Sequence, residues 1–436
     1  MLSAGCTILK RMIHKVGWAV HHHKPTKLEG SSAADWYGGI SLVGRHGGVA
    51  RYRGHIRTTA CAQFVKITRG STALARIEET RSRLEMESPT MARRTEGKAG
   101  KVVCVTGAGG YIASWLVKLL LSRGYAVHAT VRDPCDPKNA HLGRLEGASE
   151  NLRLFKADVL DRDALAAAVA GCQGVFHLAC PVPTDKVVDP ESEVLAPAVK
   201  GTLNILQACS ANDVHKVVVV SSTAAVHFNP EWPQDRPKDD NCWSDINFCK
   251  KNEDWYMVAK VAAEKTALGY GEESGLNVIT VCPTMALGPL LRHVVNVSHE
   301  FLIYIIKGGP TVMNNMLWHI VDVRDVADAL LLVYEKEESS GRYICAPDRI
   351  NTKDLLNILK KTRPDYNYVN CDNDSDLKSI FTPITSEKLK NLGWKPRKME
   401  ETLSDTIEYY EKAGLLKDVE GCPCRLPHPF HMATDK

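Results

Sequence analysis

The chain has 436 residues, of which 44% are hydrophobic and 24% charged, and its formal net charge is +4. This composition is typical of a globular protein with room for two domains and a loose appendage. A net charge this small argues against a nucleic-acid partner. No run of about 18 apolar residues occurs, so we expect no membrane-spanning helix. The 14 cysteines are scattered through strand and helix patterns, which favours reduced thiols in a cytoplasmic protein over a disulfide framework.

Residues 1–97 differ from the rest of the chain. The first 75 residues contain two acids, Glu29 and Asp35, among scattered Lys and Arg, and no period of 3.6 or 2 persists. We interpret this leader as a disordered basic extension, or as translated upstream sequence with Met86 or Met91 as the working start. The alternative is an organellar transit peptide, which would place the protein in a plastid rather than in the cytoplasm.

A glycine-rich stretch, Lys101 to Ala113 (KVVCVTGAGGYIA), begins the regular part of the chain. Its apolar start reads as a short buried strand, and apolar residues at helical spacing follow the glycines. Gly107 permits a tight turn, Gly110 lets the backbone approach a pyrophosphate, and small Ala113 lets the helix pack against the strand. A glycine-rich turn alone is weak evidence, but strand, turn and helix in this order predict a dinucleotide cradle at a helix N-terminus.

Strand and helix patterns alternate beyond this stretch, which predicts a Rossmann-type α/β fold, a doubly wound parallel sheet with a smaller C-terminal substrate lobe. The expected strands are Tyr125–Val131, Leu152–Ala157, Gly174–Leu178, Lys216–Val220 and Leu276–Cys282, and the expected helices include Asp163–Val169, Ala196–Asn212, Trp255–Tyr270, Leu355–Lys361 and Met399–Lys412. We place the dinucleotide-binding domain at residues 98–283 and the lobe at 284–420. A segment near 320–335 is expected to rejoin the main sheet, and residues 421–436 to form a frayed tail.

The end of the second expected strand favours NADP over NAD. An NAD enzyme usually places a carboxylate there for the ribose 2′-hydroxyl, whereas Arg132 and Lys138 offer two cations for a 2′-phosphate. Asp133 keeps NAD open as an alternative. Asp158, at the end of the third strand, is placed to accept a hydrogen bond from the adenine amine, or else to cap a helix.

Ser222, Tyr256 and Lys260 are the candidate catalytic residues. Ser222 follows the fifth strand at the edge where ligands bind in such sheets, and Tyr256 and Lys260 lie four residues apart on one helix face. An ammonium beside a phenol favours the phenolate, which makes the tyrosine a usable proton donor. A Tyr-x-x-x-Lys spacing alone is often only a surface pair; after a strand ending in Ser-Ser-Thr it predicts proton transfer to a carbonyl that Ser222 holds.

The sequence resembles the extended short-chain dehydrogenase/reductases, and among them the plant cinnamoyl-CoA reductases and dihydroflavonol reductases. The resemblance rests on VTGAGGYIASW, VRDP, ADVLD, SSTAAV, CWSDINFCKKNEDWYMVAK and VDVRDVADALLLVYE, and it spans roughly Lys101 to Leu416. It implies a catalytic triad of Ser222, Tyr256 and Lys260. It also implies cofactor contacts from Gly107, Ala108, Gly109, Gly110, Tyr111, Ile112, Ala113, Arg132, Lys138, Asp158, Val159, Leu178, Ala179, Cys180, Tyr256, Lys260, Pro283, Thr284, Met285, Ala286 and Ser298.

Two departures from the cinnamoyl-CoA reductases bear on the substrate. Those enzymes carry Asn-Trp-Tyr-Cys-Tyr-Gly-Lys where this chain has DWYMVAK, from Asp254 to Lys260. They also direct a His, a Lys and an Arg towards the CoA phosphates, whereas the corresponding positions here are Phe301, Tyr304 and Thr352. Arg292 and His293 are candidate replacements, although nothing in the sequence aims them at a ligand.

We therefore expect hydride transfer from NADPH to a phenylpropanoid-type carbonyl: a hydroxycinnamoyl thioester, an aromatic aldehyde or a flavonoid ketone. Candidate aromatic pocket residues, each of which is alternatively core packing, are Trp255, Phe228, Trp232, Phe301 and Tyr304. A nucleotide-sugar epimerase or dehydratase shares fold and triad, and a non-catalytic NADP-sensing protein shares the fold. We expect no metal, since Cys422-Pro-Cys424 lacks a second ligand pair, no nucleic acid or membrane as partner, and a monomer or homodimer.

Overall fold

The computed structural model describes residues 18–22, 36–44, 49–56, 101–372, 382–418 and 424–434. The chain divides into two compact units, Met1–Thr95 and Glu96–Lys436. In the first unit an antiparallel sheet has the order β1-β2-β3, with bounds Trp18–His22, Trp36–Gly44 and Val49–Ile56. The sequence analysis did not anticipate these strands. The rest of the leader, with Met86 and Met91, lies outside the described residues, so the disordered extension remains a prediction there.

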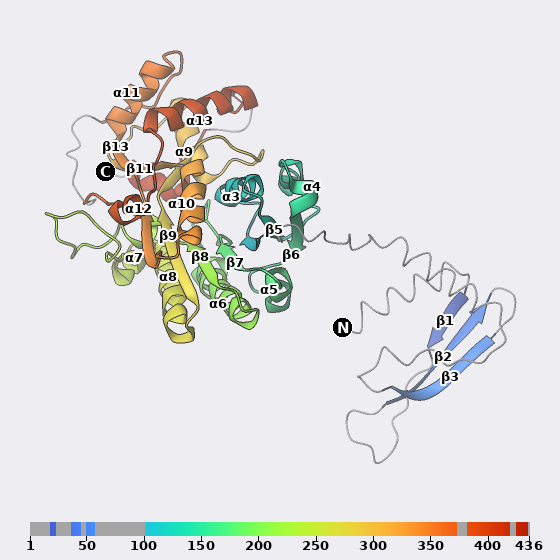
Figure 1. Cartoon of the computed structure of the whole chain (residues 1–436). Helices are drawn as coiled ribbons and strands as arrows, with labels where there is room; N and C mark the ends of the chain where they lie inside the picture. The colour runs from blue at the N-terminus through green and yellow to red at the C-terminus, as the bar shows by residue number, and fades with distance from the viewer. Residues whose placement is uncertain are drawn as a thin grey trace. The chain divides into compact units, whose positions relative to one another are not determined.

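A seven-stranded parallel sheet forms the centre of the second unit, in the order β12-β9-β8-β7-β4-β5-β6 (Figure 1). The strands are β4 (Val102–Thr106), β5 (Ala126–Val131), β6 (Leu152–Lys156), β7 (Gly174–His177), β8 (Lys216–Val220), β9 (Asn277–Pro283) and β12 (Gly341–Cys345). From β4 the chain first builds the sheet outward through β5 and β6 and then, from β7, in the other direction. The predicted doubly wound fold is confirmed, and its ligand crevice is expected where the order reverses, between β4 and β7.

Helices cover both faces of this sheet because side chains of a strand alternate between its faces. Val103 and Val105 of β4 pack with Leu116 and Leu120 of one helix, whereas Cys104 belongs to a separate core on the other face. The first face carries α3 (Tyr111–Ser122) and α10 (Val323–Glu335), and the second carries α5 (Arg162–Val169), α6 (Ala196–Ala211) and α8 (Trp255–Ser274) (Figure 1). The central strands β4, β7 and β8 are thus buried on both faces, as their uninterrupted apolar runs predicted, whereas the edge strand β6 is partly exposed.

The smaller lobe has its own sheet and core. Its sheet has the order β10-β11-β13, with bounds Met285–Leu287, Leu317–Asp322 and Asp348–Asn351. Its helices are α9 (Val297–Ile306), α11 (Thr352–Thr362) and α13 (Met399–Ala413). Thr284 alone separates β9 from β10, so the chain passes from the main sheet to the lobe at the carboxyl edge, where ligands bind in this kind of fold.

Two expectations about the lobe are wrong. In the segment near 320–335, the helix α10 packs on the main sheet as expected, but the strand β11 does not join that sheet, because it pairs with β10 and β13. The strand that rejoins the main sheet is β12, parallel to β9. A buried apolar strand has the same local pattern in either sheet, so its partner could not be deduced from periodicity. The tail is not frayed between residues 424 and 434: Phe430 stacks on Phe301 with ring centroids 4.3 Å apart, and the Ala433 carbonyl accepts a 2.7 Å bond from Asn314. Cys422 lies outside the described residues.

Shorter elements complete the described part of the chain. They are η1 (Pro137–Asn139), η2 (Leu142–Arg144), α4 (Ala148–Asn151), the π-helix η3 (Glu191–Leu195), η4 (Thr223–Ala225), α7 (Ile246–Lys251), α12 (Glu387–Asn391) and η5 (His428–Ala433). Within the described residues, each helix is too short or too polar to cross a lipid bilayer.

Candidate active site

The glycine-rich turn between β4 and α3 is built for close backbone approach. Gly107 has a φ of +65°, and a Cβ there would lie 2.9 Å from the Cα of Ala179. A Cβ on Gly109 would lie 2.0 Å from Oδ1 of Asn139. Gly110 caps α3 without a side-chain hydrogen bond, which leaves the first N–H groups of the helix to an external acceptor. These features fit a dinucleotide pyrophosphate at the helix N-terminus.

Thr130, which sequence reasoning missed, fixes this turn from the neighbouring strand β5. Its hydroxyl accepts a 3.2 Å bond from the Gly107 N–H, and its carbonyl accepts a 3.0 Å bond from Ala108. Thr106, the last residue of β4, fixes the segment after β7, because its hydroxyl accepts bonds from the Leu178 and Ala179 N–H groups at 3.1 and 3.2 Å. For each threonine, the only sequence signal of such a role was a position at or next to the end of a strand.

The two cations predicted to contact a 2′-phosphate differ in their surroundings. Arg132 directly follows β5 and is exposed. Lys138 is also exposed, but its Nζ lies 2.7 Å from Asp136 Oδ2. This ion pair, with the bond from the Lys138 N–H, lowers the pKa of Asp136. Arg132 is therefore the freer cation for a phosphate, and Lys138 would have to leave Asp136.

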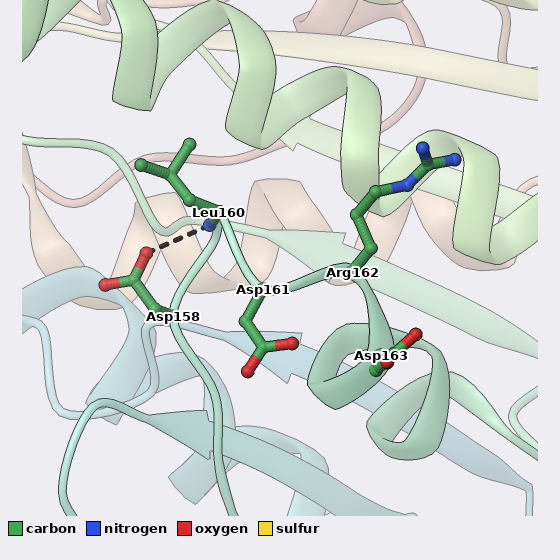
Figure 2. A pocket seen from close by; sticks show the side chains of 5 residues that line it. All are labelled: Asp158, Leu160, Asp161, Arg162 and Asp163. Carbon is green, nitrogen blue, oxygen red and sulfur yellow. Dashed lines mark hydrogen bonds between the residues drawn. The ribbon is translucent and has the colours of Figure 1, made fainter. Parts of the chain in front are cut away.

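Asp158 lies at an open depression of about 590 Å³ beyond the end of β6 (Figure 2). Leu160, Asp161, Arg162 and Asp163 line the rest of it. Oδ1 of Asp158 accepts a 2.9 Å bond from the Leu160 N–H, so this carboxylate organises a turn, and Asp161 is the residue that caps α5. Val159 packs against Gly201, where a Cβ would lie 2.9 Å away. An adenine amine that entered this depression would contact the carboxylate of Asp158.

The remaining predicted cofactor residues lie at strand ends on the same edge. Leu178, Ala179 and Cys180 follow β7 directly. Pro283 ends β9, Thr284 donates a 2.7 Å bond to the His319 carbonyl, and Met285 and Ala286 pair with β11. Ser298 lies half-buried in the first turn of α9. Because carboxyl ends of parallel strands share one edge, the predicted residues of β4, β5, β7, β8 and β9 gather at it.

Lys260 is buried next to Tyr256, as the four-residue spacing on α8 predicted. Its side chain is 5% exposed, its Nζ donates a 3.3 Å bond to the Val220 carbonyl, and Nζ lies 5.7 Å from the centroid of the Tyr256 ring. Burial lowers the pKa of Lys260, but Cys180, Tyr256 and Cys282 together raise it, so the net pKa lies above its ordinary value. This upward shift favours the cationic form of Lys260 beside Tyr256.

Ser222 caps the short helix η4, and Ser221 alone separates it from β8. Its Oγ accepts a 3.1 Å bond from the Ala224 N–H, which leaves the hydroxyl proton to be donated elsewhere. Helix η4 packs against α8, the helix that carries Tyr256 and Lys260. The structure thus brings the elements of the three predicted catalytic residues together at the carboxyl edge.

A buried ion pair that the sequence analysis missed lies one helical turn after Lys260. Glu264 Oε1 and Oε2 lie 2.8 and 3.2 Å from Nε and Nη2 of Arg342, and both side chains are almost fully buried. Glu264 also accepts bonds of 2.7 Å from the hydroxyls of Ser221 and Thr280. The pair therefore joins α8, β12, β9 and the loop that carries Ser222.

Arg342 extends this network to the segment before α7. Its guanidinium donates to the carbonyls of Cys242 and Ala225, the latter at 3.0 Å, and lies 3.8 Å from the centroid of Trp243. Glu264 lies on a mostly apolar face of α8, and Arg342 lies on the mostly apolar strand β12. The charge at each of these otherwise apolar positions was a sequence signal, but it does not identify the partner of either residue.

Phe301 and Tyr304 are not pocket residues. Both are buried in the lobe core, where Phe301 stacks on Phe430 and the Tyr304 hydroxyl accepts a 3.2 Å bond from Thr311 N–H. Thr352 is likewise buried, and its hydroxyl accepts a 3.0 Å bond from Trp318 Nε1. Helix periodicity could not tell a lobe core from a ligand pocket, because both bury apolar side chains.

Phe228, Trp255 and Trp232 occupy two smaller cores near η4. Phe228 packs with Cys249 and Val258, with Trp255 partly buried against them. Trp232 is partly exposed, and the Arg236 guanidinium lies 4.4 Å from its ring centroid. Trp255 and Trp232 keep exposed surface for a ligand, and Trp255 directly precedes Tyr256.

Comparisons with known proteins identify the family that the chain resembles. The sequence model described as the NAD dependent epimerase/dehydratase family matches residues 103–346. Cinnamoyl-CoA reductase 1 of Petunia hybrida is 42% identical over 319 residues, which cover 73% of this chain and 94% of that protein.

Solved structures agree with the sequence comparison. Vestitone reductase from alfalfa (Medicago sativa) has a TM-score of 0.62 and 31% identity, covering 72% of this chain and 99% of that one. Yeast methylglyoxal/isovaleraldehyde reductase, solved with NADPH, has a TM-score of 0.64 and 25% identity, covering 72% of this chain and all (100%) of that one. These relatives are reductases that act on differently named substrates.

Proposed function

The chain belongs to the NAD dependent epimerase/dehydratase family and is an NADP-dependent oxidoreductase of the short-chain dehydrogenase/reductase type, and we propose that it reduces the carbonyl of a phenylpropanoid-type aromatic substrate. The observation that carries the proposal is the buried, charged Lys260 held between the Val220 carbonyl and Tyr256. NADPH, when bound, supplies the hydride.

In this proposal the protein's own residues handle the proton. Ser222 donates a hydrogen bond from its hydroxyl to the substrate carbonyl oxygen, keeps its own proton and fixes the position of that oxygen. Tyr256 transfers its phenolic proton to the oxygen as negative charge develops there. Lys260 stabilises the resulting phenolate, because its ammonium is kept charged beside the ring. Positioning by Ser222 and proton transfer by Tyr256 together favour the alkoxide-like transition state over the ground state.

The substrate is proposed to be an uncharged aromatic aldehyde or ketone rather than a CoA thioester. Phe301, Tyr304 and Thr352 take the positions that are cationic in the cinnamoyl-CoA reductases, and all three are buried in the lobe core. None of them can supply charge to the CoA phosphates, and each charge-assisted hydrogen bond is worth about 1.5–3 kcal/mol. A petunia relative named for cinnamoyl-CoA supports the aromatic part of the proposal, and the alfalfa relative named for vestitone supports a ketone as well.

NADPH oxidation, followed by absorbance, tests this proposal against three matched series: hydroxycinnamoyl-CoAs, the corresponding free aldehydes, and dihydroflavonols. We expect kcat/KM for an aldehyde or ketone to exceed that for the matched CoA thioester. A thioester that is reduced most efficiently would overturn the substrate assignment and leave the reductase assignment intact. Failure of all three series would refute the phenylpropanoid class.

A further inference from the structure

Arg292 is a cation without an anionic partner beside the glycine-rich turn. It lies in the segment between β10 and α9, and its Nη1 donates a 3.2 Å bond to the carbonyl of Gly109. Its Nε is buried and has no hydrogen-bond partner among the described residues. No carboxylate within the described part of the chain forms an ion pair with it, and Tyr111 is the group that raises its pKa against the lowering by burial.

Two histidines and a tyrosine near Arg292 offer it no negative charge. His299 lies near it, and burial lowers the pKa of His299 to about 3, so the ring is uncharged at neutral pH. His141 is shifted in the same direction, by burial first and by Arg292 among other cations. The hydroxyl of Tyr111 donates a 3.0 Å bond to the Gly288 carbonyl. A partly buried guanidinium among neutral neighbours destabilises the empty protein unless an anion enters.

We propose that Arg292 binds the pyrophosphate of the dinucleotide cofactor and closes the phosphate cradle from the lobe side. Gly109 lies inside the turn that a pyrophosphate would approach, and α3 directs its uncapped N–H groups to the same place. The bond to the Gly109 carbonyl therefore sets the guanidinium beside the bound phosphates. It also commits Arg292 to the cofactor and removes it as a replacement for the missing CoA-binding cations.

This role predicts a pattern of binding that differs from the one expected for Arg132. A pyrophosphate is common to NADPH and NADH, so Arg292 should contribute equally to both, whereas a 2′-phosphate contact affects NADPH alone. The proposal rests on use of a nicotinamide dinucleotide and is independent of the carbonyl substrate. Binding is therefore measured without substrate, and failure of the proposed phenylpropanoid reduction would leave this test unaffected.

The experiment measures Kd for NADPH and NADH by calorimetry in the full-length wild type, Arg292→Gln and Arg292→Lys. Lys361→Gln, which removes an exposed cation on α11, is the control for net charge. We expect Arg292→Gln to weaken both cofactors by about ten- to a hundred-fold, the range of charge-assisted hydrogen bonds. Arg292→Lys should retain part of the affinity, and Lys361→Gln should bind both cofactors like wild type.

Thermal unfolding of the same proteins without cofactor separates ligand binding from a structural role. The midpoint of Arg292→Gln should equal or exceed that of wild type, because an unpaired buried charge has been removed, and NADPH should raise it less than it raises the wild type. A midpoint well below wild type for both Arg292→Gln and Arg292→Lys would overturn the proposal in favour of structural packing. Unchanged Kd values, or a loss confined to NADPH, would also overturn it.

Discussion

Glu264 and Arg342 form an almost fully buried ion pair, with Nε 2.8 Å from Oε1, one helical turn beyond the buried Lys260. Glu264 lies on α8 with Tyr256 and Lys260, and it accepts a bond from Ser221, the residue before Ser222. Arg342 lies on β12 and binds the Ala225 carbonyl at the end of η4. The ion pair thus connects α8, which carries Tyr256 and Lys260, with η4, which Ser222 caps. The separation of α8 and η4 decides whether the three candidate catalytic residues lie close together.

Removing one partner should therefore be worse than removing both charges. Arg342→Met leaves the Glu264 carboxylate buried without its cation, and we expect a loss of about 3–5 kcal/mol in the free energy of unfolding. Arg342→Met combined with Glu264→Gln leaves no unpaired charge and keeps an acceptor for Ser221. Urea unfolding should find the double variant more stable than Arg342→Met alone. Equal or greater loss in the double variant would contradict the account.

Cofactor preference should depend on Arg132. A 2′-phosphate carries nearly two negative charges, and Arg132 is exposed beyond β5, whereas Lys138 is paired with Asp136. Arg132→Ala should weaken NADPH binding by about 1.5–3 kcal/mol and change NADH binding much less. Lys361→Ala, an exposed cation on α11, controls for net charge. Equal losses for the two cofactors would show that Arg132 stacks on adenine, and a wild-type preference for NADH would reverse the assignment.

Acid should destabilise the protein through His299. Burial lowers its pKa to about 3, and its Nδ1 is hydrogen-bonded to the Tyr410 hydroxyl at 2.7 Å. The unfolded chain takes up a proton near pH 6.5 and the folded chain does not, so stability present above pH 6.5 is lost as pH falls towards 3.

The expected size of this effect is about 1.4 kcal/mol per pH unit for one such histidine. Between pH 7 and pH 5, His299→Gln should therefore lose about 2 kcal/mol less unfolding free energy than wild type. His215→Gln, an exposed histidine at the start of β8, is the control and should behave like wild type. Parallel pH profiles for wild type and His299→Gln would contradict the assignment.

The leader should be dispensable for chemistry. Both sheets of the reductase unit, and every predicted site residue, lie within Glu96–Lys436. A chain that begins at Met91 should have the same kcat and the same affinity for NADPH as the full chain. Loss of activity or aggregation of the shortened chain would show that residues before Met91 contribute to the reductase fold.

Most of the fold could be predicted from local patterns in the sequence. Six of the seven parallel strands follow from short apolar runs, and the main helices that cover them follow from helical spacing, because periodicity and apolar runs are local properties of the sequence. The partner of a strand is not local, which is why β11 was assigned to the wrong sheet and β12 was missed. The tail was misjudged because Phe430 packs against Phe301, a contact between residues far apart in sequence.

The candidate site likewise contains residues that the sequence could predict and residues that it could not. Gly107, Ser222, Tyr256 and Lys260 lie at strand ends or at a fixed helical spacing, so their convergence could be predicted. Partners of buried charges could not be predicted, since only the folded chain aligns Glu264 with Arg342. The same holds for Arg292, whose bond to Gly109 joins residues 183 positions apart.

Tyr256 is the proton donor on which the whole account depends, and its replacement is the most direct test. Tyr256→Phe keeps the ring beside Lys260 and removes the phenolic proton. Tyr270→Phe, on the same helix and bonded through its hydroxyl to Ser210 at 3.0 Å, is the matched control. The measurement is kcat with the best carbonyl substrate, together with Kd for NADPH. We predict that Tyr256→Phe loses about 10²–10⁴-fold in kcat with near-normal NADPH binding, and that Tyr270→Phe is unchanged. A kcat within a few-fold of wild type for Tyr256→Phe would contradict the account.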